Sequence, residues 1–188
     1  PIYPRSGSNI SLSVQATPAY SIWFNRETDY SDLPTEQKYK WSEYHKWKFK
    51  AEWYTAIVGN LVLRTAIKTG MMGFYNDEIG HAAFERFELG GDGIANFNLQ
   101  GKDIIALRGY DETDVTRRTT TQGHPFFAKY TVELRYPLTL NPNSTIYGLA
   151  FVEGGNSWAT FNEFNPLEVN RSAGVGLRFF LPMFGTLG

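Results

Sequence analysis

The chain has 188 residues, and its formal net charge of −1 gives no basis for a basic, nucleic-acid-binding surface. It contains no cysteine, which leaves neither a disulfide framework nor a thiolate metal site. Aromatic residues make up 16%, and 18 glycines with 9 prolines favour a turn-rich, all-β protein. No apolar run approaches the roughly 18 residues of a membrane helix, whereas a barrel strand needs only about 9 to 11.

Two predicted strands open the chain, at about residues 8–20 and 43–58, and apolar and polar residues alternate in both. The second is the more informative because its two faces differ most. One face carries Trp47, Phe49, Ala51 and Trp53, and the other carries Lys48, Lys50 and Glu52. Side chains alternate between the faces of a strand, so this strand separates an oily environment from an aqueous one. The pattern is typical of a barrel wall with lipid outside and water inside.

Four further strands are predicted at about residues 61–73, 128–139, 145–156 and 171–181. The third strand of the chain follows Gly59-Asn60, a link that suits a tight hairpin. The fourth alternates cleanly and places Glu133 on its charged face. The fifth is ambiguous in pattern because both of its faces are apolar as far as Glu153, and its prediction depends on β-rich composition.

The links between these strands alternate in length. Two are short, at 59–60 and 141–144, and three are long, at 21–42, 74–127 and 157–170. Transmembrane barrels have short periplasmic turns at one rim and long loops at the other. The sequence therefore predicts an antiparallel transmembrane β-barrel.

The number of predicted strands is too small for a closed barrel, because the smallest have about eight. An open sheet edge in lipid would leave backbone groups unsatisfied at several kcal/mol each, by order of magnitude. We therefore expect residues 1–188 to be a partial barrel domain whose remaining strands lie outside this sequence.

The link at 74–127 contains a glycine turn at Gly90-Gly91 and, further on, Leu107-Arg108-Gly109-Tyr110. The tetrapeptide resembles the [VL]-R-G-[FY] signature of the outer-membrane protein assembly and two-partner secretion superfamily. Residues 4–8 (PRSGS) and 171–177 (RSAGVGL) resemble two further motifs of that superfamily, in the same order. Within it, nearly the whole chain resembles the C-terminal half of the barrel in the BamA family of assembly factors. The resemblance implies a barrel of roughly 16 strands, with POTRA repeats that this sequence does not contain.

The resemblance also implies a role for the tetrapeptide. In that family the signature lies on a loop folded back inside the barrel, where its arginine meets acidic residues of neighbouring strands. The matching positions are Arg108 with Glu133 and Glu153 as its partners in the lumen. A guanidinium is a planar fork of donors that lysine cannot copy, and Gly109 lets the loop backbone approach the wall closely.

The contribution of such a contact depends on water. In a hydrated lumen it is worth about 0–1 kcal/mol, whereas deleting one partner of a sealed pair costs roughly 3–5 kcal/mol. Apolar and aromatic residues in and around the motif favour the sealed case: Ile104, Ile105, Leu107 and Tyr110.

As to function, the resemblance implies an assembly factor that folds and inserts β-barrel proteins into the outer membrane without covalent chemistry. Its expected partners are unfolded outer-membrane clients, accessory lipoproteins held mostly through POTRA repeats, and outer-membrane lipid, with no nucleic acid. Two alternatives remain. A two-partner-secretion exporter or a porin could share the motif, and a soluble β-sandwich binding module would bury the aromatic faces between sheets.

Nothing in the sequence indicates catalysis, a metal or a cofactor. His45, His81 and His124 have no metal-binding spacing. The glycines at 90–93 lack both the spaced carboxylates of a calcium loop and the Gly-Lys-Ser/Thr of a phosphate loop. There is no Gly-x-Ser-x-Gly nucleophile elbow. We therefore expect no catalytic residues, no cofactor, no metal and no enzymatic activity.

Overall fold

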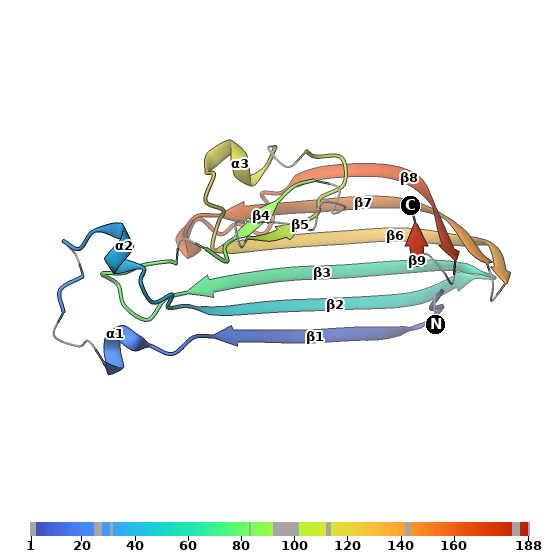
Figure 1. Ribbon diagram of the computed structural model, residues 1–188. Helices are drawn as coiled ribbons and strands as arrows, with labels where there is room; N and C mark the ends of the chain where they lie inside the picture. The colour runs from blue at the N-terminus through green and yellow to red at the C-terminus, as the bar shows by residue number, and fades with distance from the viewer. Residues whose placement is uncertain are drawn as a thin grey trace.

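The computed structural model describes residues 3–24, 28–30, 32–82, 84–91, 102–111, 114–141, 144–181 and 185–187. Its main element is a seven-stranded sheet in the order β1-β2-β3-β6-β7-β8-β9, in which all neighbours are antiparallel (Figure 1). These strands are β1 (Gly7–Ala16), β2 (His45–Val58), β3 (Leu61–Gly73), β6 (Phe126–Asn141), β7 (Ser144–Trp158), β8 (Asn170–Leu181) and β9 (Gly185–Leu187). The sheet is not closed, so the protein is an all-β, partial β-barrel.

The links contain the remaining elements. A second sheet consists of two short parallel strands, β4 (Phe87–Leu89) and β5 (Asp103–Ile105). The helices are the short α1 (Tyr20–Trp23), α2 (Thr35–Lys38) and α3 (Thr116–Thr119), with one 3-10 turn, η1 (Phe161–Glu163). No helix in the described part of the chain is long and apolar enough to cross a membrane.

All six predicted strands are present in the main sheet, with two corrections. The first ends at Ala16 rather than at residue 20, because Pro18 has no backbone N–H to donate to a neighbouring strand and α1 begins at Tyr20. The prediction of about six strands also missed β9, whose three residues are too few to show an alternating pattern.

The two faces of the sheet separate as the alternation predicts. Trp47, Phe49 and Trp53 are 39%, 37% and 40% exposed, so no second layer covers them in the described part of the chain. This finding contradicts the β-sandwich alternative, which requires these side chains to be buried between two sheets. The opposite face is polar and buried in part, with Glu52, Thr131 and Glu133 among its covered residues.

The long links emerge at one end of the sheet and the short turns at the other. The segment between β1 and β2, which contains α1 and α2, extends beyond one end, while the N-terminus lies at the opposite end (Figure 1). Gly59-Asn60 forms the tight turn between β2 and β3 there. The link between β3 and β6 instead folds back along the sheet, and its α3, β4 and β5 lie over the polar face of β6 and β7.

Three apolar clusters lie on this polar face. The first joins Tyr3 and Val62 to Tyr147 and Leu149 of β7, which explains why both faces of the fifth predicted strand are apolar. The second contains Met72, Ala82, Phe87 and Phe127, and the third contains Leu89, Leu107 and Val115. The last two clusters fix the folded-back link against the wall, and with it the predicted motif.

Candidate functional site

The glycine turn and the Leu107–Tyr110 tetrapeptide lie side by side in the folded-back link. The Gly90 N–H donates to the Ile105 carbonyl at 3.0 Å, and the Gly91 N–H donates to the Tyr110 carbonyl at 2.9 Å. In return, the Leu107 N–H donates to the Gly91 carbonyl at 3.1 Å. These bonds continue the short parallel pairing of β4 with β5 and hold the tetrapeptide as a turn over the sheet.

Arg108 lies between the two glutamates that the sequence pairs with it. Its Nη2 donates to Glu133 Oε2 at 3.0 Å and to Glu153 Oε1 at 2.7 Å. The Arg108 backbone N–H also donates to Glu153 Oε2 at 3.2 Å. The guanidinium carbon lies 3.6 Å from the ring centroid of Phe151, which adds a cation–π contact. One nitrogen therefore serves both carboxylates, and the flat face of the group rests on an aromatic ring.

Each glutamate has further partners on the barrel wall. Glu153 accepts from Thr131 Oγ1 at 3.1 Å and pairs with Lys129 Nζ at 3.1 Å. Glu133 accepts from Arg135 Nε at 2.5 Å and lies 3.9 Å from Arg64. The site is thus a network in which cations on three elements surround two carboxylates.

Burial makes this network energetically important. The side chain of Glu133 has 0% exposure and that of Glu153 has 3%, while Arg108 retains 24%. Both carboxylates are desolvated, so removing one cation would leave a buried negative charge short of a partner. The cost of breaking such a pair is about 3–5 kcal/mol.

The other three residues of the tetrapeptide also contact the rest of the fold. Leu107 is fully buried in the cluster with Leu89 and Val115. Gly109 has a left-handed φ of 83°, and a Cβ added there would lie 3.3 Å from the Cβ of Ser172 on β8. The Tyr110 hydroxyl donates to the carbonyl of Arg171 at 2.8 Å. Together with Arg108, the turn therefore touches β6, β7 and β8.

Several residues of this site were not singled out from the sequence. Lys129 donates to the carbonyl of Ala106 at 2.6 Å as well as pairing with Glu153, so it ties β6 directly to the link. The sequence feature that could have identified Lys129 was its position on the charged face of its strand. Phe151 gave no signal, because an aromatic ring under a guanidinium has no sequence spacing of its own.

A hydroxyl network anchors the link at a second point. Ser157 Oγ of β7 lies 2.9 Å from His124 Nδ1 and 2.7 Å from Thr116 Oγ1. The other ring nitrogen of His124 is 3.2 Å from Thr119 Oγ1. Burial lowers the pKa of His124 below its usual value, so the neutral ring is favoured. This arrangement holds α3 on the wall.

A third attachment is ionic and involves β5. Asp103 pairs with Lys48 at 2.9 Å and with Lys46 at 3.0 Å, and Lys46 also pairs with Glu85 at 3.1 Å. Burial alone would raise the pKa of Asp103, but the hydrogen bonds from Lys48 and Lys46 outweigh it and lower that pKa. Asp103 is thus ionised at neutral pH and joins the link to β2.

Among the residues that the structure describes, no group of three or more histidine, aspartate or glutamate side chains could hold a metal ion. The geometry is that of a docking site between a loop and a barrel wall: two buried acids, one arginine from the loop and apolar clusters on either side. The fold and the site together define a membrane-type β-barrel protein with a loop bound to the polar face of its wall.

The comparison with family models identifies the class. The model described as the Omp85 superfamily domain matches residues 1–187, and the chain belongs to this superfamily. Membership implies outer-membrane protein insertion or secretion, and it associates the protein with the outer membrane. A search of curated proteins gave no match.

Proposed function

We propose that this chain forms one wall of the barrel of a BamA-type assembly factor, which folds and inserts β-barrel clients into the outer membrane. In this proposal the Leu107–Tyr110 turn braces the barrel interior, and the protein acts through non-covalent contacts and is not an enzyme. The clients are unfolded outer-membrane proteins, with accessory lipoproteins and outer-membrane lipid as further partners.

The observation that carries the proposal is the double contact of Arg108. Its guanidinium joins Glu133 of β6 to Glu153 of β7 at 3.0 and 2.7 Å. Tyr110 extends the attachment to the backbone of β8. Three adjacent strands tied to one turn resist being pulled apart, so a barrel built this way opens elsewhere. Unpaired backbone groups at such an opening can template an incoming client strand by edge pairing.

The test replaces Arg108 by alanine and by lysine in the full-length protein. Client insertion is measured in proteoliposomes as the fraction of a client barrel that becomes protease-resistant. We expect Arg108→Ala to slow insertion by about tenfold or more, which corresponds to about 1.4 kcal/mol. Arg108→Lys should restore little, because an ammonium group is a point charge that cannot also lie flat on Phe151.

The control is Arg118→Ala, which removes the same charge from the exposed side of α3. Unchanged insertion and unchanged barrel stability in both Arg108 variants would refute the bracing role. A protein that exports a soluble polypeptide across the vesicle membrane but inserts no client barrel would instead be a secretion member of the superfamily.

A further inference from the structure

Three lysines stand directly opposite one another on neighbouring strands of the polar face. The register pairs Lys50 of β2 with Lys68 of β3, and Lys68 with Lys129 of β6. Directly opposite residues share a face, and like charges in this position repel. Lys68 is therefore flanked by a lysine on each side.

The carboxylates near this row are already shared. Glu52 pairs with Lys50 at 3.0 Å but also with Arg64 at 2.5 Å. In the same way, Glu153 serves both Lys129 and Arg108, and Asp103 serves both Lys48 and Lys46. Lys68 makes no ion pair or hydrogen bond within the described part of the chain. The row consequently carries more positive charge than its protein partners neutralise.

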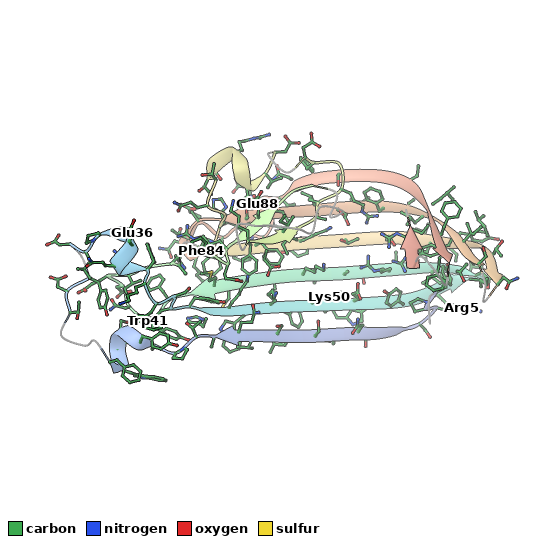
Figure 2. All side chains as sticks on the ribbon, viewed as in Figure 1. Arg5, Glu36, Trp41, Lys50, Phe84 and Glu88 are labelled. Atoms are coloured by element: carbon green, nitrogen blue, oxygen red, sulfur yellow. The ribbon has the colours of Figure 1, made fainter. Side chains whose placement is uncertain are left out.

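A pocket of about 350 Å³ opens beside the row. Its floor includes Lys48, Lys50 and Lys68, and residues 103–105 of β5 lie on another side. The hydroxyl residues Ser11 and Ser13 of β1 also line it, directly opposite Lys50 and Lys48 in the register. Lys50 is labelled midway along β2 in Figure 2, and its side chain is 37% exposed. Ammonium groups and hydroxyls thus line a space that solutes can reach. The one carboxylate lining it among the described residues, that of Asp103, is paired with Lys46 and Lys48.

We propose that this pocket binds a phosphate group, held by Lys68 and Lys50 with Lys48 and the serine hydroxyls around it. A phosphate carries more than one negative charge and several acceptor oxygens, so it can engage several ammonium groups at once. A single carboxylate from the chain could not neutralise the row, since each one nearby already serves two cations. The phosphate belongs either to a soluble phosphate compound or to the headgroup of a phospholipid.

The experiment titrates the full-length protein, purified in a maltoside detergent without phospholipid, with inorganic phosphate in a calorimeter. Chloride at matched ionic strength gives the screening background. We expect saturable binding to the wild type and a loss of affinity of about tenfold or more in Lys68→Gln, from the removal of one ammonium–phosphate contact. Lys40→Gln, an exposed site in the link between β1 and β2, makes the same charge change and should leave binding unchanged.

A second measurement separates this role from a merely structural one. Without phosphate, Lys68→Gln should leave the melting temperature unchanged or raise it, because it relieves repulsion. With phosphate, the wild type should gain melting temperature and the variant should not. A variant that melts lower than the wild type in both conditions would contradict the proposal, as would equal phosphate affinities.

A parallel titration with the short-chain lipid dihexanoyl phosphatidic acid distinguishes the two sources. Saturation by inorganic phosphate alone indicates a soluble phosphate compound, and saturation by the lipid, with or without inorganic phosphate, indicates a phospholipid headgroup. Saturation by neither probe would overturn the proposal.

Discussion

The polar face of the sheet carries two groups of charged residues that differ in burial. Around Glu133 and Glu153, the link between β3 and β6 covers the wall, and each carboxylate contacts several cations. Around Lys68, the wall is open enough to leave Lys48 and Lys50 with 35% and 37% of their side chains exposed. In the first group every carboxylate is paired within the chain, whereas in the second Lys68 makes no ion pair within the described residues.

This difference distinguishes the charged residues that stabilise the fold from those that are available to bind a ligand. Buried charges tolerate no missing partner, so the covered group must be matched within the chain. Exposed lysines are hydrated and can stay unmatched until a ligand arrives. Variants in the covered group should therefore change stability, whereas variants in the open group should change ligand binding.

The largest expected effect comes from Glu133→Gln. This change removes the charge that Arg135 and Arg108 contact at 2.5 and 3.0 Å, at a position with no exposed surface. We expect the free energy of unfolding to fall by about 3–5 kcal/mol, measured by thermal and denaturant unfolding in detergent. Glu36→Gln, on the exposed surface of α2, should stay within about 0.5 kcal/mol. Equal effects of the two changes would remove the distinction between covered and open charge.

A smaller effect is expected from Gly109→Ala. Its φ of 83° is left-handed, and a Cβ would meet Ser172 at 3.3 Å. We expect the docking of the link between β3 and β6 on the sheet to lose about 1–2 kcal/mol of stability, detected as faster proteolysis of this link. Gly80→Ala is the matched control, because its φ is 71° and nothing lies within 4 Å of the added Cβ. The difference between the stability losses of the two variants measures the steric contact of the turn with β8. Equal losses would show that the turn makes no close contact with this strand.

The smallest effect concerns pH and the second attachment of the link. Burial lowers the pKa of His124 below 6.5, so its contribution to docking is complete above that pH. As the pH falls below about 6.5, the undocked form takes up a proton that the docked form resists, and docking weakens. The protection of residues 114–124 against hydrogen exchange, taken relative to the intrinsic exchange rate at each pH, should therefore be lower at pH 5.5 than at pH 7.5. His124→Gln, which cannot titrate, should reduce this difference, and an unchanged difference would assign the effect to another group.

Much of this arrangement could be predicted from the sequence because its causes are local. The strands and their faces depend on alternation, which a chain such as Trp47-Lys48-Phe49-Lys50 displays without reference to other segments. Glu133 was placed on the charged face by the same rule. The tetrapeptide at 107–110 was identified by its resemblance to a superfamily, and the family model matches residues 1–187.

The remaining features depend on which distant segments meet. β4 and β5 have three residues each, too few to show a period, and they pair only because the link folds back along the sheet. The contact of His124 with Ser157 joins residues 33 positions apart, and no spacing indicates it. The same holds for the burial of Lys46, which carries a positive charge at 1% exposure because Glu85 and Asp103 arrive from the link.

The sequence by itself determined the antiparallel strands, their apolar and polar faces, and the tetrapeptide whose resemblance pointed to the superfamily, because alternation and short motifs are properties of neighbouring residues. Only the tertiary structure decided which charges are covered and which stay open. Burial is created when the link between β3 and β6 packs on β6, β7 and β8. This packing covers the network around Arg108 and leaves Lys68, among the described residues, without an ion pair.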